Sequence, residues 1–138
     1  MPDAIVDELL QLNQRLLDSI AAGDWATYQE LCDPALTAFE PEALGQLVEG
    51  MEFHHFYFKL GGFRGNHHTM MCSPRVRVLG DAAVIAYVRL NRRVAADGSP
   101  YSTGFEETRV WQRQNGRWRH VHFHRSAIPS RDRPQRSA

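Results

Sequence analysis

The stretch FEETRVWQRQNGRWRHVHFHRSA, residues 105–127, decides the fold of this chain. Two runs of strand-forming residues flank Asn115-Gly116, and this dipeptide favours a two-residue hairpin because both central residues of a type I′ turn need positive φ. The stretch is therefore predicted to form an antiparallel hairpin. A loop of two residues pairs Gln114 with Arg117, Trp111 with His120, Arg109 with His122 and Glu107 with His124.

The same register assigns each side chain to a face, because side chains alternate along a strand. Neither face is purely polar, so both are expected to be covered. One face carries Phe105, Glu107, Arg109, Trp111, Trp118, His120, His122 and His124. The other carries Glu106, Thr108, Val110, Val121, Phe123 and Arg125.

Charge and length limit the classes of function. The chain has 138 residues, enough for one domain with its own core, and we assign this domain to residues 1–130. Its 16 basic and 16 acidic residues cancel, which argues against binding to nucleic acid or to an anionic membrane. Lys59 is the only lysine, and the arginines that make up the other cations suit bidentate contacts with carboxylates or phosphates, although codon usage explains the bias equally well.

The ends of the chain and its cysteines point to a cytoplasmic protein. Cys32 and Cys72 lie in apolar contexts, so we expect reduced core residues. The acidic start MPDAIVDELL does not resemble a signal peptide, and no apolar run is long enough to span a bilayer. Residues 131–138 are expected to be a disordered tail.

Periodicity predicts helices followed by strands. Apolar residues recur every three or four positions over 3–22, Gly23 suits a C-terminal cap, and Asp24 suits the N-cap of a second helix. A short strand over 36–41, brief helices over 43–48 and 51–58, and a glycine loop with Gly61, Gly62 and Gly65 come next. Strands over 68–79 and 82–94 and a turn over 97–100 lead into the hairpin. The class is α+β, with N-terminal helices packed on a curved antiparallel sheet, a cone that encloses a pocket.

Three strings carry a family resemblance: CDPALTAFEPEALGQLVEG from Cys32, FHHFYF from Phe53, and EETRVWQRQNGRWRHVHFHRSAIPS from Glu106. From about Ile5 to Ser130 the chain resembles the association, or hub, domain of calcium/calmodulin-dependent protein kinase II. That family has the nuclear transport factor 2-like fold, also called SnoaL-like. The resemblance implies a homo-oligomer, from a dimer up to two stacked rings.

Kinase and calmodulin functions are not expected of this sequence. It has no glycine-rich nucleotide loop and no HRD or DFG string, so we expect no phosphoryl transfer and no cofactor. Its only basic run, residues 131–136, lacks the apolar anchors of a calmodulin-binding helix. The resemblance therefore implies a free-standing homologue of the hub.

The family also has a deep pocket for small carboxylates, lined by a histidine and arginines. By position in the matching strings these are His54, Arg89, Arg109 and Arg125. Clustered guanidinium groups repel one another, and a bound carboxylate relieves that repulsion. Without a ligand, Glu107 or Glu106 is expected to act as counter-ion.

Two features bear on that pocket. The regular hairpin register puts Arg109 and Arg125 on opposite faces, so a shared pocket requires a β-bulge, which we predict. The loop KLGGFRGN, with Phe63 as its only aromatic residue, is shorter than the tryptophan-bearing loop of the kinase hub and lacks the tryptophan that can cover the pocket there.

His120, His122 and His124 fall on one predicted face, a pattern that two interpretations fit. Zinc binding is disfavoured because same-face residues on one strand stand too far apart for three ligands to converge, so no metal is expected. The preferred interpretation is the wall of a pocket or interface, with Trp111 and Trp118 nearby. The plain expectation for the other aromatic residues is core: Trp25, Tyr28, Phe53, Phe56, Tyr57 and Phe58.

An enzyme is the alternative function, since SnoaL-like relatives include isomerases and cyclases that use a carboxylate or histidine base. Here the candidates would be Glu107 or Glu40 as base and His54 as acid-base group. Carboxylates paired with arginine have lowered pKa values and make poor bases. Anion binding is therefore the preferred hypothesis.

Overall fold

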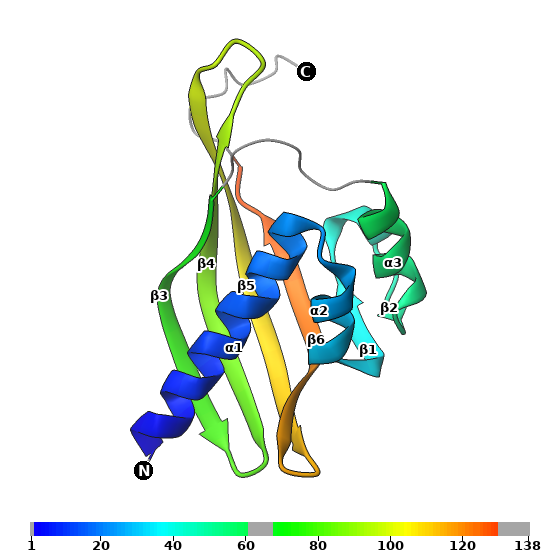
Figure 1. Ribbon diagram of the computed structural model, residues 1–138, viewed down its shortest axis with the longest axis vertical. Helices are drawn as coiled ribbons and strands as arrows, with labels where there is room; N and C mark the ends of the chain where they lie inside the picture. Colours follow the sequence, from blue (N-terminus) through cyan, green and yellow to red (C-terminus); the bar gives the residue numbers. More distant parts are fainter. Residues whose placement is uncertain (1, 61–67, 130–138) are drawn as a thin grey trace.

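Residues 2–60 and 68–129 are described by the computed structural model, in which three α-helices and one 3-10 helix accompany six strands (Figure 1). The helices are α1 (Pro2–Ala22), α2 (Trp25–Leu31), the 3-10 helix η1 (Pro41–Ala43) and α3 (Glu52–Lys59). The strands are β1 (Cys32–Phe39), β2 (Val48–Glu49), β3 (His68–Leu79), β4 (Ala82–Val94), β5 (Pro100–Gln114) and β6 (Arg117–Ala127). The predicted glycine loop with Phe63, and the tail, lie outside these residues.

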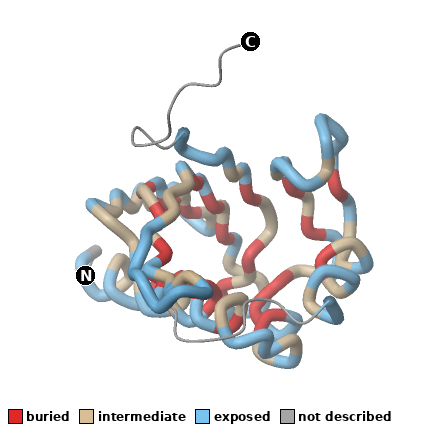
Figure 2. Tube along the Cα trace, turned by 90° about the horizontal axis from the view of Figure 1, so that it is seen from above, coloured by how far each residue is buried: buried red, intermediate tan, exposed pale blue. Residues whose placement is uncertain are grey.

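All six strands form one sheet in the order β2-β1-β6-β5-β4-β3. Neighbours are antiparallel except β1 and β6, which run parallel. The sheet is curved, and α1 and α2 cover its concave face while α3 lies beside β1 and β2 (Figure 1). The buried segments lie inside this curve (Figure 2). The predicted α+β fold, with N-terminal helices on a curved antiparallel sheet, is confirmed.

The N-terminal helices form for the reasons that the sequence suggests. The apolar stripe of α1 buries Leu9, Leu16 and Leu17 completely. Gly23 ends the helix with a φ of 69°, a left-handed conformation that glycine adopts without strain. Asp24 then caps α2, because its Oδ1 accepts a hydrogen bond from the Thr27 amide at 3.2 Å. None of the helices in the described part of the chain is long and apolar enough to cross a membrane.

The predicted helix over 43–48 is wrong. Only Pro41–Ala43 is helical, as η1, and Leu44 and Gly45 follow with positive φ values of 54° and 88° that end it. Val48 and Glu49 instead pair with β1 as strand β2. Strand β1 also begins earlier than predicted, and it tolerates Pro34 because the β1–β6 register shifts between Cys32 and Thr37.

The aromatic core is partly as predicted. Tyr28 is 1% exposed, but Phe56 and Tyr57 are 55% and 39% exposed, so their assignment to the core of this chain is wrong. Trp111 and Trp118 are buried in the core, which corrects their predicted place at a pocket mouth or interface. The indole of Trp111 donates a hydrogen bond from Nε1 to Asn13 Oδ1 at 3.0 Å, which joins β5 to α1.

The hairpin contains the bulge that the sequence analysis predicts. Asn115 and Gly116 have φ values of 52° and 79°, and the strands pair as predicted back to Trp111 and His120. The register then shifts, so that Val110 pairs with His122 and one extra residue, Val121, stands on β6.

This shift corrects two predicted pairs and the predicted faces. Arg109 pairs with Phe123, and Glu107 pairs with Arg125. His122 and His124 therefore point to the convex face, whereas His120 is fully buried on the concave face. The single histidine face of the sequence analysis is wrong for this reason.

Candidate functional site

A cavity of about 340 Å³ opens between α3, the segment after β1, and the concave face of the sheet. Polar and apolar side chains share its wall. The described residues that line it are Ile20, Gly23, Tyr28, Glu40, Glu42, His54, Tyr57, Phe58, Leu60, Arg89, Asn91, Arg93, Phe105, Arg109, Phe123 and Arg125.

The four predicted ligand-binding residues all line this cavity. His54 comes from α3, Arg89 from β4, Arg109 from β5 and Arg125 from β6. The bulge at Val121 is what puts Arg109 and Arg125 on the same face. That these residues bind a carboxylate stays a prediction.

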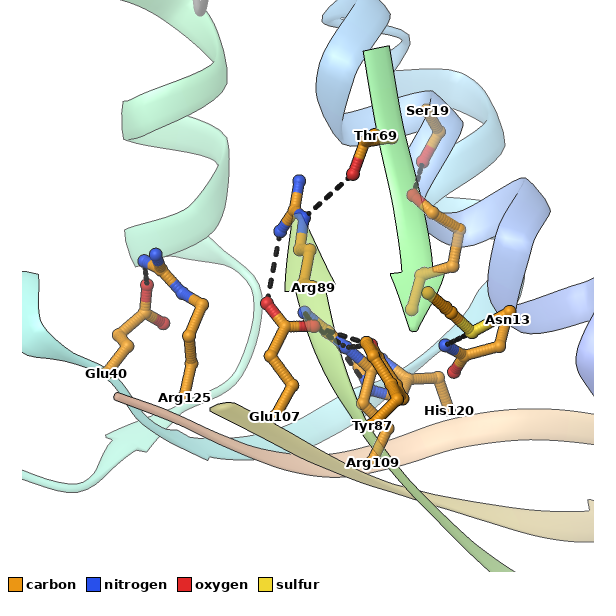
Figure 3. A network of polar contacts seen from close by, with 12 residues as sticks. Asn13, Ser19, Glu40, Thr69, Tyr87, Arg89, Glu107, Arg109, His120 and Arg125 are labelled. Atoms are coloured by element: carbon orange, nitrogen blue, oxygen red, sulfur yellow. Dashed lines mark hydrogen bonds and ion pairs between the residues drawn. The ribbon is translucent and has the colours of Figure 1, made fainter. Parts of the chain in front are cut away.

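Glu107 is the buried counter-ion of Arg89 and Arg109, two of the arginines that line the cavity (Figure 3). Its carboxylate, with a side chain 0% exposed, accepts hydrogen bonds from Tyr87 Oη at 2.5 Å and from Arg89 Nη1 at 3.2 Å. Arg109 donates from Nε at 3.1 Å and from Nη2 at 3.0 Å to Oε1. Burial alone would raise the pKa of the Glu107 carboxyl, but Arg109 and Arg89 outweigh it and lower the pKa to about 2. Glu106, the other suggested counter-ion, is exposed.

Arg109 is enclosed on its remaining sides. Its guanidinium lies 4.3 Å from the centre of the Phe123 ring, a cation–π contact. Burial would lower the pKa of Arg109, but the Glu107 carboxylate more than compensates, so the pKa is raised and the residue stays charged. Nη1 of Arg109 lies 3.4 Å from Nε2 of His120.

His120 is therefore a neutral imidazole. Burial, and then the Arg109 charge, lower its pKa well below the usual 6.5. An arginine only donates, so Nε2 accepts, and the single ring proton lies on Nδ1, 3.4 Å from Cys32 Sγ. Burial raises the pKa of Cys32 to about 12, so this free cysteine is a thiol, as expected for a core residue. No group of three or more metal-ligating side chains occurs in residues 2–60 and 68–129.

A second polar cluster, of two ion pairs and a histidine–glutamate contact, lies at the mouth of the cavity. Glu40 Oε2 lies 2.8 Å from Nε2 of His54, and Glu40 Oε1 lies 3.6 Å from Nη2 of Arg125 (Figure 3 shows Glu40 and Arg125 side by side). Nη2 of Arg125 also donates to both oxygens of Glu42, at 2.5 and 2.6 Å. The Arg125 guanidinium lies 4.6 Å from the centre of the Phe105 ring.

Comparisons with known proteins show the family of this chain. Residues 6–129 match the family described as calcium/calmodulin dependent protein kinase II association domain. The chain belongs to this family. The delta subunit of calcium/calmodulin-dependent protein kinase type II from Oryctolagus cuniculus is 48% identical over 126 residues, which are 89% of this chain. Those residues are 24% of the relative, so the chain spans about a quarter of that protein's length.

Solved structures of association domains are similar throughout. The association domain of the Caenorhabditis elegans kinase has a TM-score of 0.86 and 45% identity, over 90% of this chain and 96% of that chain. The hub homology domain from Chlamydomonas reinhardtii has a TM-score of 0.84 and 44% identity, over 91% and 99% of the two chains. A nuclear transport factor 2-like protein from Salmonella enterica, 23% identical with a TM-score of 0.76 over both whole chains, shares the fold.

The charges of this association domain favour an anion in the cavity. The described residues that line the cavity include four arginines, Arg89, Arg93, Arg109 and Arg125, and two glutamates, Glu40 and Glu42. The guanidinium groups can offer an anion bidentate contacts.

Sequence reasoning missed three polar residues of the cavity: Glu42, Asn91 and Arg93. Asn91 and Arg93 follow Arg89 at intervals of two on β4, so strand alternation could have placed them on the same face. Glu42 lies in the matching string TAFEPEAL, but its position depends on η1, which the sequence analysis assigned to the wrong segment.

We expect the stability of the domain to fall below about pH 6.5 because of His120. Its pKa is depressed in the folded state, so the unfolded chain takes up a proton that the folded chain does not, and stability is lost as pH falls. When the unfolded chain binds one more proton than the folded chain, the free energy of unfolding falls by about 1.4 kcal/mol per pH unit. Urea unfolding from pH 7.5 to 5 should show this slope in the wild type and a smaller slope in His120→Asn.

The matched control is His124→Asn, because His124 is exposed on the same strand. This variant should keep the wild-type slope. An unchanged slope in His120→Asn would contradict the assignment.

Proposed function

We propose that this chain is a self-associating domain whose cavity binds a small carboxylate. The observation that carries the proposal is the cavity itself, because the described residues of its wall include four arginines and a histidine but only two glutamates. Family membership supports the self-association part, and the arginines of the cavity wall support the ligand part. In this proposal the chain acts in the cytoplasm and has no kinase activity of its own.

Exposed apolar side chains support self-association. Among the described residues of the isolated chain, five large ones are more than half exposed: Leu44 at 87%, Leu60 at 64%, Leu79 at 58%, Phe56 at 55% and Val94 at 53%. Contact with further copies would remove this apolar surface from water. The names of the similar solved structures, association domain and hub, agree with such a role.

Light scattering coupled to size exclusion tests self-association, and we expect a mass of at least ten times the 15.8 kDa chain. A monomer would contradict the proposal. A dimer would instead favour the enzyme-like alternative, because paired sheets are common among SnoaL-like enzymes.

The apolar part of the cavity wall supports a compact organic acid rather than an inorganic anion. Phe58, Leu60, Phe105 and Phe123 line it beside the arginines. A carboxylate would contact the guanidinium groups while its hydrocarbon part packs against these rings and leucine.

Thermal shift with acetate, butyrate and benzoate tests the ligand class. A ligand at 100 times its Kd stabilises the folded state by about 2.7 kcal/mol, so at least one acid should raise the Tm by several degrees. The neutral isosteres butyramide and benzamide should not. Arg125→Gln should lower the affinity for that acid about tenfold or more while leaving the hydrogen bonds of Glu107 intact. If no acid stabilises the wild type, the proposal is contradicted.

Proton-transfer catalysis is the second candidate function. The pair of His54 and Glu40, with side chains that are each 7% exposed and 2.8 Å apart, is the observation that favours it. Glu107 is unsuited as a base because its pKa is about 2. If the pair is an acid-base group, the wild type should catalyse exchange of the methyl protons of pyruvate, which are α to its keto group, with deuterated water. NMR can follow this exchange, and His54→Gln should abolish its catalysis.

A further inference from the structure

We propose that Glu42 is a built-in competitor that occupies Arg125 when the cavity holds no ligand. The inference rests on the proposed carboxylate site and identifies the residue that sets its affinity. Glu42 presents to Arg125 the same chemical group that a carboxylate ligand would present. Both oxygens of Glu42 lie within hydrogen-bond distance of Nη2 of Arg125, at 2.5 and 2.6 Å.

The three carboxylates of the site differ in how firmly they are held. Glu107 is 0% exposed in its side chain and receives hydrogen bonds from three residues, so a ligand cannot displace it without leaving a buried charge unpaired. Glu40 is 7% exposed in its side chain and also bonds to His54. Glu42, in contrast, is 37% exposed in its side chain and can turn into solvent.

The backbone around Glu42 can also yield. Glu42 belongs to the three-residue helix η1, which is closed by hydrogen bonds from Ala43 N to Glu40 O at 3.0 Å and from Leu44 N to Pro41 O at 3.2 Å. Arg125 of β6 ties this short helix to the sheet. An ion pair with an exposed partner contributes little to stability, so breaking it costs little.

Arg125 is consequently the arginine that can exchange partners. Arg109 is 1% exposed and donates to Glu107 from Nε and Nη2. The Arg125 side chain is 13% exposed, and of its two glutamate partners the nearer one, Glu42, faces solvent. An incoming carboxylate replaces Glu42 on Arg125, Glu42 turns outward, and η1 loses its tie to β6. Ligand binding at the cavity thereby loosens the segment that leads to the exposed Leu44.

The test uses whichever of acetate, butyrate and benzoate stabilises the wild type most. Calorimetry measures the affinity of Glu42→Gln and of the wild type for this acid. Glutamine keeps the size of the side chain and removes the competing charge, so the Kd should fall about fivefold. Glu49→Gln is the matched control, since Glu49 is exposed on the neighbouring strand β2 and does not line the cavity. It should bind as the wild type does.

Two further measurements isolate the role of Arg125. In an Arg125→Gln background, Glu42→Gln should give no gain, because the competition is for Arg125. Hydrogen exchange at the amides of Ala43 and Leu44 should become faster when the acid saturates the wild type. In Glu42→Gln the acid should leave these exchange rates unchanged.

The outcomes separate the inference from the proposed function. If the wild type binds an acid but Glu42→Gln binds it equally or more weakly, the inference is overturned and the carboxylate site stands. A gain that persists without Arg125 also overturns it. If neither the wild type nor Glu42→Gln binds any of the acids, the inference and the proposed function fall together.

Discussion

Glu107→Gln should lower the free energy of unfolding by about 3–5 kcal/mol, since breaking a buried ion pair on one side leaves the other charges uncompensated. The substitution keeps the shape of the side chain and removes its charge. Arg89 and Arg109, 5% and 1% exposed, would then face each other without a counter-ion. Urea unfolding at a fixed protein concentration measures the loss, because self-association makes apparent stability depend on concentration.

Glu106→Gln is the matched control for this prediction. Glu106 is the preceding residue on β5, but it is exposed on the opposite face of the sheet. Its replacement should change the free energy of unfolding by no more than about 0.5 kcal/mol. Equal losses for the two variants would contradict the structural role assigned to Glu107.

The acid dependence of stability provides a second readout of Glu107. Its pKa is about 2 in the folded state against 4.5 as the ordinary value, so its contribution is complete above pH 4.5 and is lost as pH falls toward 2. Glu107→Gln should remove that part of the acid dependence. The step associated with His120, at higher pH, should remain.

The hairpin illustrates what the sequence could predict of this fold and site. Asn115-Gly116 set the turn and the pairing back to Trp111, because two positive φ values leave few alternatives. The position of the bulge could not be read from alternation, since each strand alone allows either face. The bulge was indicated only by the family resemblance, which requires Arg109 and Arg125 to share a pocket.

The segment after β1 illustrates what the sequence could not predict. Residues 43–48 have helix-forming composition, but pairing of β2 with β1 overrides that local preference. The position of Glu42 next to Arg125 joins residues 83 positions apart, and no local pattern encodes such a contact. The arginines of the site were therefore predictable, whereas their internal partner at the cavity mouth was not.

Trp111→Ala should lower the free energy of unfolding by about 3–5 kcal/mol, which is the other large effect that we expect in this domain. Trp111 is completely buried at the centre of the core, where it packs against His120 at 5.4 Å between ring centres. Alanine would leave a cavity there and would also remove the donor to Asn13. The loss should appear as a lower urea midpoint at fixed protein concentration.

Trp111→Phe separates the hydrogen bond from the packing. Phenylalanine keeps most of the ring volume but leaves the buried Oδ1 of Asn13 without its 3.0 Å donor, which costs about 1–3 kcal/mol. Asn13→Ala and the double variant complete a cycle, and its coupling energy measures the bond that joins β5 to α1. Because Asn13 Nδ2 also lies 3.2 Å from Met71 Sδ on β3, Asn13→Ala alone should cost more than the coupling energy. Equal losses for Trp111→Phe and Trp111→Ala would mean that the indole hydrogen bond, rather than the packed ring, holds α1 against the sheet.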